Sequence, residues 1–208
     1  LKYDSSKPFT KDIKYQNYFE ATDSVKIPKA YIIPQGMHHV IERLKLNNIE
    51  MSRLEKDTLI DVESYRISHY KSRQSPYEGH YLHYNTKVET SVKNLNFISG
   101  DYIVKTNQKG MRYLLETLEP EAPDSFFNWN FFDTILQQKE GFSPYVWEDK
   151  AQSLLKADPE LRKSFNEKKS NDVNFSNNWY KQLDWLHKQS NSYEKAHMQY
   201  PIYRILKL

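Results

Sequence analysis

The sequence predicts an α+β fold, with an N-terminal, mostly antiparallel β-sheet or sandwich and a helical C-terminal half packed on it. Three observations predict this class. Short β-prone runs separated by turn residues occupy residues 30–110. After about Gly110 the hydrophobic period changes to 3.6. A β-prone run returns at residues 201–205, and 208 residues are enough to bury a two-layer core.

Residues 1–29 are polar and lysine-rich, with scattered aromatic residues such as Tyr15, Tyr18 and Phe19 and no sustained helical period. They predict a linker or an edge strand that continues from a preceding domain. No basic-then-apolar leader follows Leu1, so we expect a segment of a larger protein.

The strand-rich part covers residues 30–110. It begins with a β-prone run, residues 30–33, that Pro34 ends, followed by a helical pattern containing Val40, Ile41 and Leu44. Further strands are expected at residues 49–53, 58–67, 80–97 and 101–105, with a turn at residues 75–79. The result is a mostly antiparallel region of about five to seven strands.

The helical part covers residues 111–208. One helix is expected to end before Pro120, and a second to begin at Asp124 and to be buried because its aromatic residues cover most of its circumference. Asp158 and Pro159 signal another helix start. A final helix should carry Phe175, Trp179, Leu183 and Leu186, before residues 201–205 return to the sheet. We expect residues 30–208 to form one compact unit.

The bulk composition excludes several classes of protein. Thirty basic residues against 27 acidic ones give a net charge of +3, too balanced for a nucleic-acid binder. No apolar run is long enough to span a membrane. The absence of cysteine excludes disulfides, thiolate zinc sites and cysteine nucleophiles.

The sharpest metal candidate is the pair His39 and Glu42, because a His-x-x-Glu spacing on a helix places both side chains on one face. A third ligand is needed. His80 and His83 are three residues apart, so a strand turns their rings to opposite faces unless the chain turns at Gly79. The competing interpretation places Glu42 near a helix start, where the helix dipole favours it.

Other catalytic signals are weaker. No Gly-x-Ser-x-Gly elbow or glycine-rich phosphate loop occurs among the five glycines. Carboxylates concentrate in one stretch and would suit a glycosidase pair, although capping and solvated faces explain most of them. They are Glu119, Glu121, Asp124, Asp133, Glu140, Glu148 and Asp149. The sequence therefore predicts no catalytic, cofactor-binding or metal-binding residue in this chain.

Aromatic residues make up 14% of the chain and have two interpretations. Phe127, Phe131, Trp179 and Leu183 lie at helical spacing, which favours core packing. A second set has no such spacing and would suit a surface that binds sugars or peptides. These residues are Tyr65, Tyr70, Tyr77, Tyr81 and Tyr84.

Four blocks of the sequence resemble a known family: residues 28–46, 77–83, 115–149 and 193–205. The third, LETLEPEAPDSFFNWNFFDTILQQKEGFSPYVWED, is the most distinctive. The family is the secreted, carboxypeptidase A-like zinc metallopeptidases of Bacteroidota-type bacteria, and the blocks resemble its region downstream of the peptidase domain. The resemblance covers most of the chain from about residue 28.

The resemblance implies that zinc, a His-x-x-Glu pair, a distant histidine and a catalytic glutamate lie in a preceding domain that removes C-terminal residues from peptides. No such position maps onto this chain. His39 and Glu42 match the family's zinc motif in residue type and spacing, but they lie in the region downstream of the peptidase domain. We therefore expect a periplasmic or secreted accessory module whose partner is that peptidase domain. An independent glycan- or peptide-binding module is the first alternative, and a zinc hydrolase using His39 and Glu42 the second.

Overall fold

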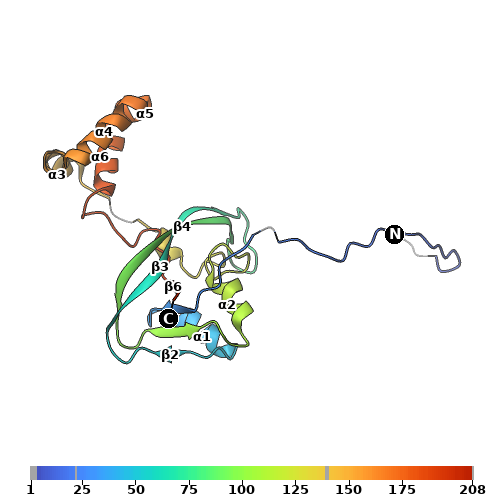
Figure 1. Ribbon diagram of the computed structural model, residues 1–208. Coiled ribbons are helices and arrows are strands. Elements are labelled where there is room, and N and C mark those ends of the chain that lie inside the picture. The colour runs from blue at the N-terminus through green and yellow to red at the C-terminus, as the bar shows by residue number, and fades with distance from the viewer. Residues whose placement is uncertain (1–3, 22, 139–140, 208) are drawn as a thin grey trace.

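Six strands form one antiparallel sheet in the computed structural model, which describes residues 4–21, 23–138 and 141–207 (Figure 1). Across the sheet the order is β2, β5, β1, β6, β3, β4. The strands are β1 (Ala30–Ile33), β2 (Ser52–Arg53), β3 (Thr58–Ser72), β4 (His83–Phe97), β5 (Tyr102–Lys105) and β6 (Tyr203–Ile205). The returning strand predicted near the C-terminus is thus β6, which lies between β1 and β3.

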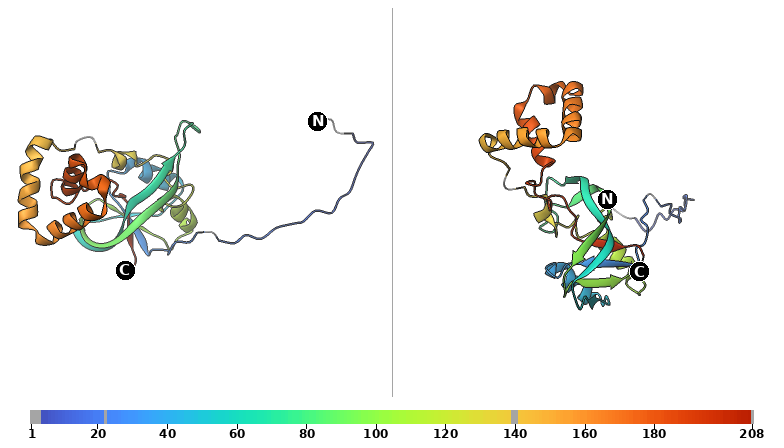
Figure 2. Two further views of the ribbon diagram at one scale, coloured as in Figure 1. Left: turned by 90° about the horizontal axis from the view of Figure 1, so that it is seen from above. Right: turned by 60° about the vertical axis from the view of Figure 1, so that its left-hand side comes forward.

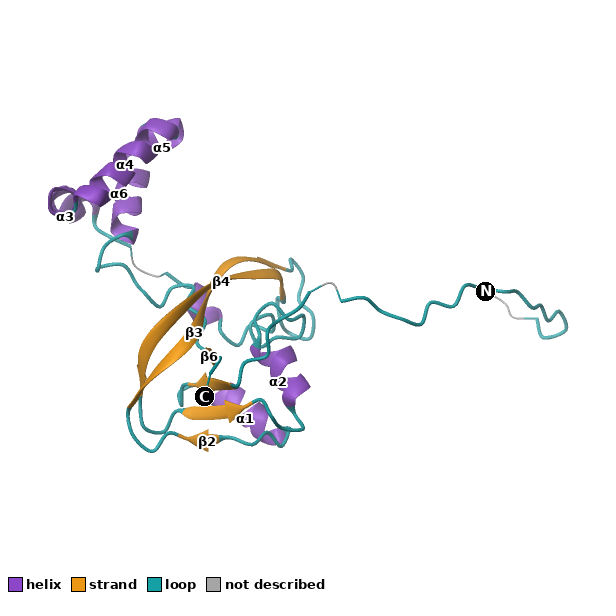
Figure 3. Ribbon diagram, viewed as in Figure 1, coloured by secondary structure: helices purple, strands orange, loops and turns teal. Residues whose placement is uncertain are grey.

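The two longest strands, β3 and β4, form a 15-residue ribbon that curves across the sheet (Figure 3). Their register runs from Thr58 opposite Phe97 to Ser72 opposite His83, with irregularities between residues 67 and 71. β4 is an edge strand. The ribbon ends in the turn predicted at residues 75–79, where Gly79 has a φ of 82°.

Helices α1 (His38–Leu46) and α2 (Met111–Leu118) cover one face of the sheet. Both were predicted from their apolar period. Leu44 and Leu114 are completely buried in the main core, together with Tyr31 of the central strand β1. Asn47 caps α1, as predicted, and the chain then reverses through Asn48 with a φ of 55°.

Residues 124–136 do not form the predicted helix; the described structure has turns and a short 3₁₀ helix, η1 (Asp133–Leu136). Polar side chains bond the local backbone instead: Ser125 Oγ donates to Pro120 O, and Asn128 Nδ2 donates to Ala122 O. Asn130 adopts a φ of 67°, which a helix does not allow. The predicted burial is nevertheless correct for the aromatic residues Phe126, Phe127 and Phe132.

Helices α3 (Pro144–Ala157), α4 (Pro159–Asn171), α5 (Val173–Ser176) and α6 (Trp179–Lys188) pack on one another and form a lobe (Figure 2). This helical lobe has a core of its own, with Trp147, Phe165 and Phe175 buried in it. Asp158 caps α4 through its side chain, as predicted. The prediction of a single final helix was wrong, because Asn178 starts a new helix by capping α6.

A smaller apolar cluster lies on the other face of the sheet and includes Ile32, Val62 and Phe97. Residues 4–21 and 23–27 extend away from the body without regular structure, so the described part of this segment forms no edge strand (Figure 3). The predicted α+β class is confirmed, whereas the division into domains stays a prediction. Among the described residues no helix is both long and apolar enough to cross a membrane.

Candidate functional site

The predicted metal pair, His39 and Glu42, lies on the solvent side of α1, and both residues are exposed. Glu42 borders a small groove that His38, Arg53 and Tyr102 also line, whereas His39 is not among its lining residues. Across the described ranges, no group of three or more histidine, aspartate or glutamate side chains is placed to hold a metal ion. His39 and Glu42 therefore have the spacing of a zinc pair without a zinc-binding surrounding.

His80 and His83 lie in different surroundings, and β4 begins only at His83, so His80 is not part of the predicted strand. The ring of His80 contacts Trp129 edge-on at 5.5 Å between centroids, near the surface. His83 is buried, and its ring contacts those of Tyr70 and Phe127, which also contact each other. The two histidines consequently belong to different environments and do not form a pair.

His83 connects a serine and an aspartate in a hydrogen-bonded chain that the sequence did not reveal. Ser72 Oγ lies 2.8 Å from His83 Nδ1, and His83 Nε2 lies 2.9 Å from Asp133 Oδ1. With Nε2 protonated, the serine hydroxyl donates to Nδ1 and the histidine donates to the carboxylate. These are the residue types and contacts of a serine-hydrolase relay.

The surroundings of this chain indicate a structural role. Asn130 Nδ2 also approaches His83 Nε2, at 3.2 Å, and donates to Tyr81 O. Catalysis would need backbone or side-chain donors aimed at an oxyanion and a cleft beside Ser72. The contacts instead join the two strands of the ribbon to η1 at the tip, where β3 ends and β4 begins. We interpret Ser72, His83 and Asp133 as a clamp that fixes the ribbon tip.

Most members of the predicted carboxylate cluster have separate structural tasks. Glu121 Oε1 accepts from Val88 N, Asp133 belongs to the clamp, and Asp124 approaches Trp129 Nε1 at 3.5 Å. Glu148 and Asp149 are exposed on α3, and Glu140 lies outside the described residues. The structure thus separates these carboxylates and forms no glycosidase pair from those it describes.

Glu119 is the exception, because it is buried beside Arg204. Its Oε1 lies 3.0 Å from Arg204 Nε and accepts a hydrogen bond from Tyr31 OH. The Arg204 Nε contact has the distance of an ion pair without hydrogen-bond geometry. Arg204 also contacts Glu63 and Tyr65 through Nη1.

Burial dominates the electrostatics of this ionic cluster. It raises the pKa of the Glu119 carboxyl, although Arg204 and the Tyr31 hydroxyl oppose the shift. Burial likewise raises the pKa of Tyr31, and the neighbouring Glu119 charge adds to the increase. One guanidinium therefore serves two carboxylates in a site closed to solvent. The arrangement joins β6 to β3 and to the end of α2, and offers no room for a substrate.

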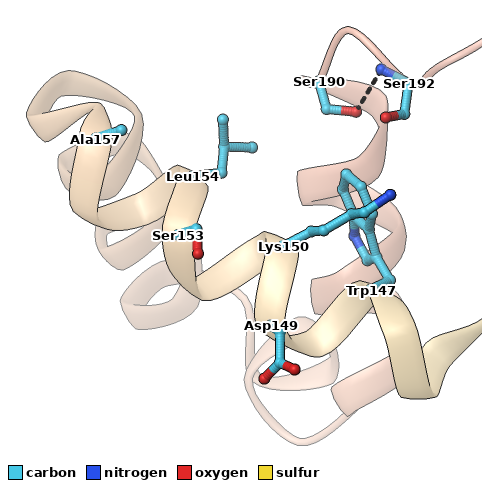
Figure 4. Close-up of a pocket in the computed structure, with 8 residues that line it drawn as sticks. All are labelled: Trp147, Asp149, Lys150, Ser153, Leu154, Ala157, Ser190 and Ser192. Atoms are coloured by element: carbon cyan, nitrogen blue, oxygen red, sulfur yellow. Dashed lines mark hydrogen bonds between the residues drawn. The ribbon is translucent and has the colours of Figure 1, made fainter.

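An open pocket of about 450 Å³ lies on the helical lobe, between α3 and the segment after α6 (Figure 4). Its floor includes Trp147, and Ser190 Oγ accepts from Ser192 N at its rim. In Figure 4 the carboxylate of Asp149 points away from this serine pair. No histidine is among the residues that define the pocket, so this lining provides no serine–histidine pair.

The five tyrosines that the sequence suggested for a binding surface divide into two groups. Tyr65 is buried in the main core, and Tyr70 packs edge-on against Phe127. Tyr77, Tyr81 and Tyr84 are exposed at the tip of the ribbon. Only this second group supports the predicted aromatic surface.

A second exposed aromatic surface lies on the helical lobe, where the sequence predicted core. Trp179 is 60% exposed, and its ring meets Tyr180 edge-on. Tyr180 in turn stacks on Phe142 at 5.4 Å between ring centroids. We call Phe142, Trp179 and Tyr180 the lobe patch.

Comparison with known proteins relates part of the chain to carboxypeptidases. It is 33% identical over 101 residues, 48% of its length, to carboxypeptidase 2 of Trichophyton tonsurans and of Trichophyton equinum. Carboxypeptidase 2 of Trichophyton rubrum is 32% identical over the same length. The chain covers only 18% of each of these relatives. It thus contains a carboxypeptidase-related region.

No family model matches the sequence, and no solved structure is significantly similar to it. The fold therefore has to be understood from its own geometry.

Proposed function

We propose that this chain is a non-catalytic accessory module of a zinc metallocarboxypeptidase-like protein, downstream of the peptidase domain and packed on it. The observation that carries the proposal is the 101-residue match, which covers 48% of this chain but only 18% of carboxypeptidase 2 from T. tonsurans. A piece of that size has room for one part of such a protein and not for the whole.

The exposed aromatic residues supply surfaces for such packing. Trp179 and Tyr180 of the lobe patch stand at the start of α6, whose Leu186, two turns further on, is buried in the core of the lobe. Large aromatic side chains exposed on ordered helices are typical of surfaces that another domain covers. The clamp likewise holds Tyr77 and Tyr81 at a fixed ribbon tip.

The proposed mechanism is structural. The module would bury its aromatic surfaces against the peptidase domain and shape access to the substrate cleft. Zinc and its ligands would belong to that domain, and the parent would be secreted or periplasmic. The family resemblance of the sequence supports both the position of the zinc site and the secreted or periplasmic location.

The test begins with the coding sequence upstream of Leu1, which should encode a His-x-x-Glu zinc motif with a distant histidine. That domain and this chain are then expressed as separate polypeptides, and their binding is measured by calorimetry. We expect a one-to-one complex that Trp179→Ser weakens at least tenfold. Tyr145→Ser, on an even more exposed tyrosine outside the patch, is the control. An upstream sequence without the zinc motif overturns the proposal.

The ribbon tip favours a second candidate, an independent glycan- or peptide-binding module. Tyr77 and Tyr81 are exposed, and Tyr77 lies against Trp129 with ring centroids 6.3 Å apart. Such rings stack on sugars or hydrophobic side chains. Titration of the isolated chain with cell-wall glycans and peptides, followed by tryptophan fluorescence, tests it. Saturable binding that Tyr77→Ser and Tyr81→Ser abolish would favour this module over the accessory role.

A further inference from the structure

The outer edge of β4 is open over residues 89–96. Ile67 of β3 and Val88 of β4 lie opposite each other, and their backbone N–H groups point away from the ribbon. Ile67 N donates to Met198 O on the β3 side, and Val88 N donates to Glu121 Oε1 on the β4 side. Strand alternation then directs the backbone groups of residues 90, 92, 94 and 96 away from β3. None of these outward groups has a hydrogen-bond partner in the described ranges.

Apart from the exposed Glu89 at its start, this stretch lacks the usual protection of an edge strand. Loop residues cover only the start of β4, where His83 N donates to Asn128 O. Lys93 does not guard the edge, since its Nζ donates to Gln199 Oε1 on the inner side. Lys87 lies before the stretch, near Asp23 and Glu121. An unguarded edge of this length is a template for another strand.

An apolar groove of about 410 Å³ adjoins the end of this edge. Leu95, Phe97, Ile98 and Tyr203 contribute its apolar lining. Odd-numbered residues of β4 face this side, because Leu95 and Phe97 belong to the same cluster as Val62. A strand added to β4 would therefore place every second side chain on the face of the sheet that carries the groove, beside Leu95 and Phe97.

The chain itself contains a segment that matches this edge. In residues 12–16 the polar Asp12, Lys14 and Gln16 alternate with Ile13 and Tyr15, and Phe9 and Phe19 occupy further odd positions; Lys11, Asn17 and Tyr18 interrupt the pattern outside this stretch. Such alternation is typical of a strand with one apolar face. The four apolar residues are at least 79% exposed, and the segment is extended and unpaired in the described structure.

We propose that residues 13–19 of one copy of this chain pair, antiparallel, with residues 91–97 of a second copy. With Tyr15 opposite Leu95, Ile13 lies opposite Phe97, so both apolar side chains lie beside the apolar residues at the border of the groove. The segment runs away from its own body (Figures 1 and 2), so a second copy receives it without rearrangement. Reciprocal exchange of the two segments closes a dimer. This pairing is independent of the proposed accessory function.

Light scattering of the purified 208-residue chain tests the proposal. Over about 10 µM to 1 mM, where weak strand pairing is measurable, the mass should rise from 24.9 kDa towards twice that value. Ile13→Asp combined with Tyr15→Asp removes the donor side chains. Val92→Pro blocks the acceptor edge without losing a ladder hydrogen bond, since Val92 N points outward. Each variant should stay monomeric.

Mixing the two variants separates exchange between copies from closure within one copy. The donor-deficient chain retains an intact edge and the edge-blocked chain retains an intact segment, so the mixture should form heterodimers. Tyr145→Asp, at an exposed tyrosine on α3, is the control and should dimerise like the unaltered chain. A monomeric unaltered chain at all concentrations, or a mixture without heterodimers, overturns the proposal.

Discussion

Replacing Arg204 with methionine should destabilise the fold in a pH-dependent way. Arg204 is buried and neutralises Glu63 and Glu119, whose side chains are themselves 15% and 5% exposed. Methionine fills a similar volume but carries no charge. The substitution leaves two carboxylates in the interior without a cation.

The magnitude follows from the cost of breaking a buried ion pair, about 3–5 kcal/mol of unfolding free energy. Burial already raises the Glu119 pKa above its ordinary value of 4.5. Between the unfolded and the folded pKa of Glu119, the folded chain therefore keeps a proton that the unfolded chain releases. The unfolding free energy falls as the pH rises through this interval. Removing Arg204 raises the folded pKa further and widens the interval. The loss of unfolding free energy caused by the substitution should shrink towards low pH, by at most about 1.4 kcal/mol per pH unit for each proton.

Urea denaturation of both proteins at pH 5, 6, 7 and 8 measures this prediction. The difference in unfolding free energy should be largest at pH 7–8 and clearly smaller at pH 5. Adding Glu119→Gln to the variant should remove most of the pH dependence, because the more buried carboxylate is then neutral. A loss that is equal at every pH, or below about 1 kcal/mol at pH 7, would refute this account of the ionic cluster.

Four further predictions concern single positions. Phe127→Ala should cost about 3–5 kcal/mol in thermal or urea unfolding, because the ring is fully buried; a cost below 1 kcal/mol would contradict the core assignment. Gly110→Ala should cost about 1–3 kcal/mol, since its Cβ would lie 2.1 Å from Ile49 Cδ1; an unchanged melting temperature would disprove this. Ser72 should not react with a fluorophosphonate probe, and Ser72→Ala should lose about 0.5–1.5 kcal/mol of stability; labelling at Ser72 would instead reveal a nucleophile. Elemental analysis should find no stoichiometric zinc, and His39→Ala should change stability by less than about 0.5 kcal/mol; one bound zinc that this variant loses would restore the zinc-hydrolase interpretation.

Local signals explain why some elements were predictable. The apolar period and the asparagine stop of α1 act within about ten residues, and Asp158 caps α4 from the adjacent position. By contrast, the aromatic residues after Asp124 suggested a helix because burial and helical period look alike in a short apolar run. Polar bonds from Ser125 and Asn128 to the local backbone decided the outcome there.

The clamp and the ionic cluster were not predictable, since tertiary contacts create both. Asp133 lies 50 positions from His83, and Arg204 lies 141 positions from Glu63. Ser72 lies opposite His83 because the antiparallel register of the ribbon, interrupted between residues 67 and 71, is restored at its tip. One signal was available for Arg204: a lone arginine inside a β-prone run, which requires a buried anionic partner.

Peptidase activity tests the central claim most directly. Mass spectrometry would follow the loss of C-terminal residues from a peptide mixture with zinc, using this chain, the proposed upstream domain, and both together. The account predicts no turnover by this chain, turnover by the upstream domain, and altered turnover when the two form a complex. Release of C-terminal residues by this chain alone would contradict it.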